Sequence, residues 1–282
     1  MRPLESLLDS VAEVKSPRST RLFSEFLPRG YRATTLSSVP QRLLDEVILT
    51  KVRIGTLITL YDDLADNPGY ANPELLDELY RLPFLDGELE GMGSEHPMRR
   101  VVAGLWRGVL TVLERLPYHE SLFDLFRFDV EQFYQANRFS ALVGRIPGLN
   151  NSLENRDYVS HNMGIVIVGT VDLMASPTFD VSELGRARAF FHRAQEAARL
   201  MNVVTTFGRE ERERDVTGEW VALMNETGIT REAAMTRLRT ELIAILDGLE
   251  LEAGRIRTFD ASDYLRGMRE LYLLHREMEP VI

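Results

Sequence analysis

The chain has 282 residues, of which 44% are hydrophobic and 27% are charged, a composition that allows a large globular core. Its formal net charge of −10 argues against a nucleic-acid partner, and the absence of cysteine excludes disulfides and thiolate chemistry. The N-terminus lacks a long apolar run, and no apolar stretch is long enough to span a bilayer. The sequence therefore predicts a cytoplasmic protein without a membrane span.

Apolar residues recur at helical spacing along most of the chain, and alternating period-2 segments are scarce. The expected helices cover residues 40–66, a short segment from 72, 97–116, 121–139, 155–174, 181–215, 230–256 and 262–277. The apolar run 165–171 is expected to be a fully buried helical segment, with a break near Gly164 or Gly169. Since no linker or internal repeat divides the chain, we predict one all-α domain, residues 1–282, with about ten helices.

Three aspartates stand at the end of the first long helix, in the stretch 57–70, LITLYDDLADNPGY. The helix dipole disfavours a carboxylate there by roughly 0.3–1 kcal/mol. Asp62 and Asp66 are four residues apart and share one face of the helix, so they also repel each other. Clustered carboxylates without His or Cys nearby suit Mg²⁺. The alternative is a helix end whose acids are simply solvated.

A second polar pattern lies in residues 202–210, NVVTTFGRE. Asn202, Thr206 and Glu210 are spaced four and four, so they form one stripe on a helix. Their amide, hydroxyl and carboxylate oxygens are ligands that a hard cation prefers, and Arg209 adds a guanidinium suited to phosphate. The alternative is a polar surface stripe that leads into the charged run 209–215.

Together, the two motifs resemble those of class I terpene synthases. The stretch Asp62-Asp63-Leu64-Ala65-Asp66 is similar to the family's DDxxD motif. The second pattern is similar to the family's N-x-x-x-[S/T]-x-x-x-E triad, and the arginine before its glutamate matches as well. The order and separation of the motifs also fit the family, as do the length and helical character of the chain.

The resemblance implies an all-α bundle around a central cavity, with both motifs at its mouth. It implies three Mg²⁺ ions bound with the diphosphate of a prenyl substrate. Asp62 and Asp66 would bridge one pair of ions, and the triad would bind the third. Asp63 points about 100° away from Asp62 on a helix, so we expect it to pair with an arginine instead.

Two further arginines are candidates for binding the diphosphate by resemblance. Arg156 precedes Asn202 by 46 residues, about the family's spacing. Many bacterial members place an arginine four residues before the glycine at the helix break, where this chain has Ser160. Arg276, within His275-Arg276-Glu277, stands where the family has a C-terminal Arg-Tyr pair.

Aromatic side chains could stabilise a carbocation in the cavity, although ordinary core packing is favoured for any single candidate. The candidates are Tyr61, Trp106, Phe133 and Tyr134.

Residues 158–174, YVSHNMGIVIVGTVDLM, are similar to kaurene-synthase-type diterpene cyclases. That resemblance implies ionisation of copalyl diphosphate, supplied by a separate class II cyclase, to an ent-kaurene-like hydrocarbon. The chain has no D-x-D-D motif for the class II step. The alternatives are a cyclase of linear farnesyl or geranylgeranyl diphosphate, a prenyltransferase, and a non-catalytic helical binding protein. A prenyltransferase is disfavoured because the later helix lacks a second aspartate-rich motif. The family is often dimeric, so a homodimer is possible.

Overall fold

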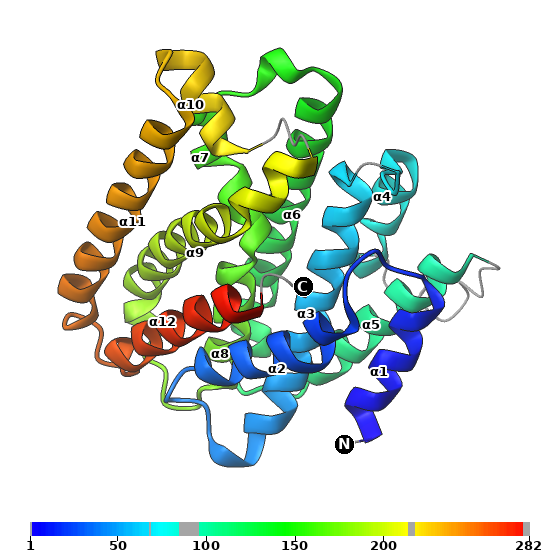
Figure 1. Ribbon diagram of the computed structural model, residues 1–282. Coiled ribbons are helices and arrows are strands. Elements are labelled where there is room, and N and C mark those ends of the chain that lie inside the picture. The colour runs from blue at the N-terminus through cyan, green and yellow to red at the C-terminus, as the bar shows by residue number, and fades with distance from the viewer. Residues whose placement is uncertain (1, 68, 85–95, 214–217, 279–282) are drawn as a thin grey trace.

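The computed structural model describes residues 2–67, 69–84, 96–213 and 218–278, and this part of the chain contains α-helices and no strand (Figure 1). The prediction of an all-α fold is confirmed. In chain order the α-helices are α1 (Arg2–Glu13), α2 (Leu27–Ala33), α3 (Gln41–Asp66), α4 (Pro73–Leu79), α5 (Pro97–Leu113), α6 (His119–Arg145), α7 (Ser152–Asp157), α8 (Ile165–Ala175), α9 (Leu184–Glu213), α10 (Glu219–Thr227), α11 (Arg231–Ala253) and α12 (Ala261–Met278).

Short polar signals set the ends of several helices. Asn72 accepts a hydrogen bond from the backbone N–H of Leu75 at the start of α4, where Pro73 fits the first turn. The Thr230 hydroxyl caps the start of α11 in the same way. Gly228 ends α10 with φ +68°, a backbone conformation that glycine adopts at little cost. The two caps start α4 and α11 where the sequence predicts these helices.

The segment 155–174 differs from the predicted single helix. It comprises the end of α7, a 3₁₀-helix, η5 (Val159–Met163), and α8. Gly164 makes the break with φ +62°, and a Cβ there would collide with Cδ1 of Ile58. The break is therefore at Gly164 and not at Gly169, which lies inside α8. Every residue of α8 is buried, as expected.

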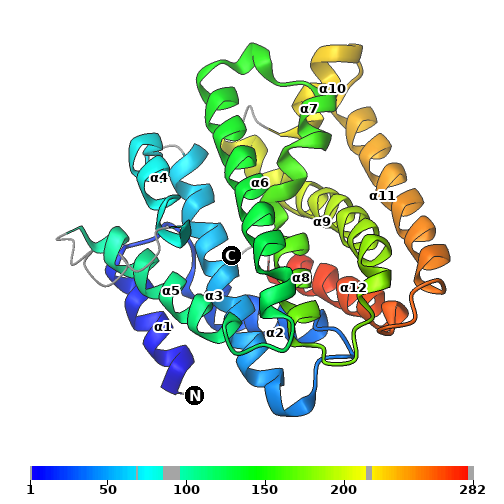
Figure 2. The same cartoon turned by 180° about the vertical axis from the view of Figure 1, so that it is seen from behind.

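The helices form layers on either side of the paired helices α3 and α6 (Figures 1 and 2). On one side α5 packs on α3, and α1 packs on α5; on the other, α9 packs between α8 and α11, and α12 packs on α2. The C-terminal ends of α3 and α9 lie at the same end of the bundle, the upper end in both views. This arrangement brings both sequence motifs to one end of the molecule.

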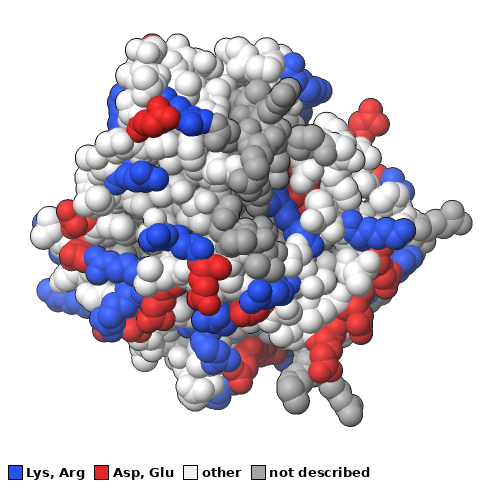
Figure 3. Space-filling model, viewed as in Figure 1, with Lys and Arg blue, Asp and Glu red and all other residues white. Residues whose placement is uncertain are grey.

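The surface mixes charges of both signs. On the face shown in Figure 3, acidic and basic side chains alternate over α11 and α12, and the described residues there form no broad basic area of the kind that binds nucleic acid. None of the described helices has the length and hydropathy needed to cross a bilayer.

Gly267 permits the close approach of α12 to the end of α2. A Cβ at this position would overlap the backbone carbonyl of Ala33, which cannot rotate away as a side chain would. We expect Gly267→Ala to lower the free energy of unfolding by about 1–3 kcal/mol, measured by urea denaturation.

Gly104 provides the matched control, because it lies inside α5 and no atom beyond its own stretch of helix lies within 4 Å of the place that a Cβ would take. Gly104→Ala is expected to be neutral or to stabilise the protein by about 0.5–1 kcal/mol. Equal effects of the two substitutions would contradict this account of the α2–α12 contact.

Candidate active site

The first motif is tied to the N-terminal segment by an arginine. Arg18 Nε lies 2.7 Å from Oδ1 of Asp63, and Arg18 Nη2 lies 3.3 Å from Oδ2 of Asp62. Asp63 is fully buried, whereas the side chain of Asp62 is 36% exposed. Asp63 also accepts hydrogen bonds from Ser16 and Asn67, both at 3.4 Å. Asp63 thus pairs with an arginine, as expected, and Asp62 keeps a solvent-facing side.

Burial raises the pKa of Asp63, and the neighbouring Arg18 guanidinium opposes that rise. Arg18 lies between α1 and the π-helix η1 (Leu22–Phe26), in the stretch SPRST. It is 45 residues from Asp63 in sequence, and nothing in its local pattern points to the end of α3. Sequence reasoning therefore predicts that Asp63 has an arginine partner but does not identify it.

The second motif lies in the C-terminal half of α9. Thr206 is 2% exposed, and its hydroxyl lies 3.2 Å from Oδ1 of Asn202 and 2.9 Å from the carbonyl oxygen of the same residue. The structure therefore brings these two predicted ligands together. The side chains of Asp66, Arg209 and Glu210 lie outside the described residues, although the backbone is helical at all three positions.

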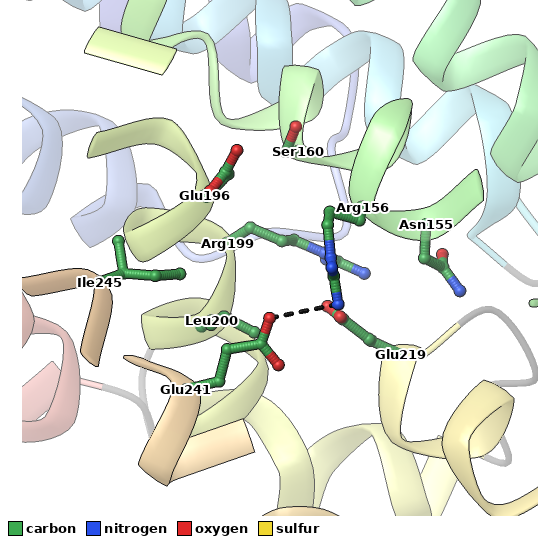
Figure 4. Close-up of a pocket in the computed structure, with 9 residues that line it drawn as sticks. All are labelled: Asn155, Arg156, Ser160, Glu196, Arg199, Leu200, Glu219, Glu241 and Ile245. Atoms are coloured by element: carbon green, nitrogen blue, oxygen red, sulfur yellow. Dashed lines mark ion pairs between the residues drawn. The ribbon is translucent and has the colours of Figure 1, made fainter. Parts of the chain in front are cut away.

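The two other predicted arginines have different surroundings. Arg156 projects from α7 into a pocket, where its Nη2 lies 3.3 Å from Oε1 of Glu241 (Figure 4). Arg276 is exposed near the end of α12, with its guanidinium 5.9 Å from the ring centre of Tyr272. Their roles toward a diphosphate stay predictions.

All four aromatic candidates belong to one cluster, together with Tyr80, which the sequence did not single out. Tyr80 stacks on Tyr61 with ring centres 4.8 Å apart, lies 6.0 Å from Phe133 and 3.8 Å from Tyr134. The hydroxyl of Tyr61 accepts a hydrogen bond from Trp106 Nε1 at 2.8 Å and donates one to the carbonyl oxygen of Leu79 at 3.2 Å. This aromatic cluster adjoins the first motif, because Tyr61 directly precedes Asp62.

The chain is similar to known proteins in structure rather than in sequence. No protein-family model and no curated protein sequence matches it. Isoprene synthase from leaves of grey poplar (Populus x canescens) is similar in structure, with a TM-score of 0.69 and 12% identity over 96% of this chain and 52% of its own. The same enzyme in complex with three Mg²⁺ ions and dimethylallyl-S-thiolodiphosphate has a TM-score of 0.69 and 12% identity, over 97% of this chain and 53% of its own. For a-eudesmol synthase the TM-score is 0.65 and the identity is 17%, over 97% of this chain and 92% of that enzyme.

The chain has a terpene synthase fold. It spans about half the length of isoprene synthase and most of the length of a-eudesmol synthase. At these identities the likeness extends to the fold, so the roles of individual residues rest on their own chemistry and placement.

The described donors at the two motifs of this terpene synthase fold suit Mg²⁺. Asp62 offers a carboxylate, Asn202 an amide oxygen and Thr206 a hydroxyl, which are hard oxygen donors without competing imidazole or thiolate. Among the side chains that the structure describes, no three His, Asp or Glu residues gather as a ready-made metal site. A complete ligand set would therefore need residues beyond these, and the sequence offers Asp66 and Glu210.

Removal of Arg18 would leave the Asp63 carboxylate buried without its cation. We expect Arg18→Ala to lower the free energy of unfolding by about 1–3 kcal/mol in urea denaturation, because a buried charged group that loses its partner keeps its desolvation penalty.

Arg21 supplies the control, since it lies in the same segment and pairs with Glu25 on the surface. Arg21→Ala should change stability by less than about 0.5 kcal/mol. Equal losses in the two variants would show that burial of Asp63 is not the cause.

Proposed function

We propose that this chain is a Mg²⁺-dependent class I terpene synthase that ionises a prenyl diphosphate and cyclises the carbocation. The observation that supports this most directly is the placement of both motifs at one end of a terpene synthase fold, on the C-terminal ends of α3 and α9. The donors described there, Asp62 with Asn202 and Thr206, have the chemistry of Mg²⁺ ligands. We also propose that residues 1–282 act as one catalytic domain.

The first requirement of the proposed chemistry is positive charge near the leaving group. Bound Mg²⁺ would supply the positive charge that stabilises the leaving diphosphate. Asp62, Asp66, Asn202, Thr206 and Glu210 are the residues proposed to hold the ions.

Other side chains are proposed to bind the phosphate oxygens and to surround the carbocation. Guanidinium groups bind phosphate oxygens through directed hydrogen bonds, and the proposed ones are Arg156, Arg209 and Arg276. Most of the aromatic cluster beside Asp62 is buried, and the cluster offers ring faces that attract a cation. Such a wall would also help to keep water from the carbocation.

We propose copalyl diphosphate as the substrate and an ent-kaurene-like hydrocarbon as the product. Support comes from the sequence of residues 158–174 and from its interrupted geometry, in which the buried Ser160 lies on η5 before the break at Gly164. A separate class II cyclase would supply this substrate. The cyclised carbocation would lose a proton to give the neutral hydrocarbon, with inorganic diphosphate as the second product.

Incubation of the purified protein with Mg²⁺ and copalyl, geranylgeranyl or farnesyl diphosphate, followed by mass spectrometry of the extracted hydrocarbons, tests the proposal. A hydrocarbon from copalyl diphosphate is expected. Product from farnesyl diphosphate alone would contradict the C20 substrate but not the terpene synthase. An elongated diphosphate would identify a prenyltransferase. The absence of any product, together with no stabilisation by Mg²⁺ and pyrophosphate, would favour a helical binding protein.

A further inference from the structure

A polar pocket lies between α7, α9, α10 and α11 (Figure 4). Two arginines, Arg156 of α7 and Arg199 of α9, share it with three glutamates, which are Glu196, Glu219 and Glu241. Two positive and three negative formal charges leave the pocket with a net charge of −1. The pocket therefore favours retention of its arginines over entry of an anion.

Arg156 is held in this pocket by one contact. Its Nη2 lies 3.3 Å from Oε1 of Glu241, and the two side chains are 53% and 31% exposed. Arg156 makes no other hydrogen bond or ion pair within the described part of the chain. Because ion pairs with this much exposure contribute little free energy, the pair with Glu241 by itself holds Arg156 only weakly.

The rest of the pocket nevertheless attracts Arg156. Glu219 is only 5% exposed and points into the pocket in Figure 4, and its carboxylate forms no hydrogen bond or ion pair with the described residues. Burial raises the pKa of Glu219, whereas Arg199 and Arg156 act against that rise. The Nε of Arg199 is itself buried without a partner among the described atoms. Departure of Arg156 would thus remove one of the two cations near Glu219.

The pocket borders the face of α9 that carries the second motif. Arg199 and Thr206 are seven residues apart, so on a regular helix they point within about 20° of each other and lie about 10 Å apart along the axis. Arg156 shares its pocket with Arg199, and Arg199 lies about two helical turns before Thr206 on the same side of α9.

We propose that Glu241 is a positioning residue that holds Arg156 in the pocket until diphosphate binds, and that it thereby weakens diphosphate binding. The inference rests on the proposed function, because it takes Arg156 as a ligand of the diphosphate. The diphosphate, with its larger negative charge, competes with one carboxylate for the same guanidinium. Glu241 thus keeps the arginine away from the second motif when no substrate is present.

Isothermal titration of the full chain with inorganic pyrophosphate, in excess Mg²⁺, tests the inference. Glu241→Gln is expected to lower the Kd for pyrophosphate about two- to fivefold, because it removes the competing charge and keeps the shape. Arg156→Gln is expected to raise the Kd about tenfold or more. In the double variant, Glu241→Gln should have no effect beyond that of Arg156→Gln.

Glu250→Gln is the matched control, because Glu250 lies on the same helix and pairs with Arg269 outside the pocket. Its Kd should equal that of the unmodified protein. An unchanged or higher Kd in Glu241→Gln would overturn the role of Glu241.

Two outcomes separate this inference from the proposed function. If Arg156→Gln leaves the Kd unchanged while the unmodified protein binds pyrophosphate with Mg²⁺, the inference about Glu241 is wrong and the proposed function stands. If the unmodified protein binds no pyrophosphate, both are contradicted.

Discussion

Asp62→Ala is expected to lose the stabilisation that Mg²⁺ and pyrophosphate together give to the unmodified protein. Ligands at about 100 times their Kd stabilise a protein by about 2.7 kcal/mol, which corresponds to a rise in melting temperature of about 5 °C at this chain length. Because the carboxylate is a proposed ion ligand, the rise should disappear, and turnover should fall at least about 100-fold. Thermal melts with each ligand alone and with both measure the first effect.

Two controls distinguish the metal site from a general loss of structure. Asp45 lies on the same helix α3 but is 84% exposed and pairs with Arg32, so Asp45→Ala should keep the full rise. On α9, Asn202→Ala should behave like Asp62→Ala. Thr205→Ala should keep the rise in melting temperature. The Thr205 hydroxyl donates a hydrogen bond to the carbonyl oxygen of Met201, and its side chain points about 100° from that of Thr206. Retention of the rise in Asp62→Ala would contradict the proposed metal site.

Lys51→Met is expected to lower the free energy of unfolding by about 3–5 kcal/mol, because it leaves the Asp172 carboxylate alone in the core. Both side chains are fully buried, and Nζ of Lys51 lies 2.8 Å from Oδ2 of Asp172. Nζ also donates to the carbonyl oxygen of Thr34 and to the Thr35 hydroxyl, and the backbone N–H of Leu36 donates to Asp172. The pair thus fastens α8 and α3 to the turn after α2. Urea denaturation at pH 7 measures the loss.

The same variant should show a distinctive dependence on pH. Burial raises the pKa of Asp172 above its value in the unfolded chain, and loss of Lys51 removes the charge that opposes this rise. When the folded-state pKa of a group lies above its unfolded-state pKa, the group contributes stability at low pH, and that contribution is lost as the pH rises. The loss of unfolding free energy in Lys51→Met should therefore be smaller at pH 5 than at pH 8. Lys51→Met combined with Asp172→Leu should recover most of the deficit. A deficit that persists in the double variant would show that the cause is packing rather than charge.

The sequence predicted the long helices because their signals are local. Asn72 and Thr230 cap their helices as the pattern indicates, and the apolar spacing along α3 continues to the aspartates at its end. The same signals underlie the two motifs, since a spacing of four on one helix is a local property. The sequence thus singles out Asp62 and Asn202 as candidate ligands without knowledge of the fold, and their roles as ligands stay predictions.

Features that depend on distant contacts were missed or misplaced. The short helices α2 and α10 were not predicted, because helices of seven and nine residues gain most of their stability from packing, here against α12 and α11. The sequence offered Gly164 and Gly169 as two positions for the helix break and could not choose between them. The side chain that requires glycine at position 164 is Ile58, which comes from the distant helix α3. Arg18 reaches Asp63 from another segment, and Tyr80 joins the aromatic cluster from the end of α4. None of these partners has a signature in its own neighbourhood.

The chain has two tryptophans, and each lies beside a different motif. The indole of Trp106 bonds Tyr61, which precedes Asp62, whereas Trp220 packs edge-on against Phe207, which follows Thr206, with ring centres 5.3 Å apart. Intrinsic fluorescence can therefore follow the two ends separately. In Trp220→Phe the remaining emission reports on the end of α3, and in Trp106→Phe it reports on the end of α9. The tryptophan emission of the two variants can thus show, without an added label, whether ions and diphosphate bind first at the end of α3 or at the end of α9.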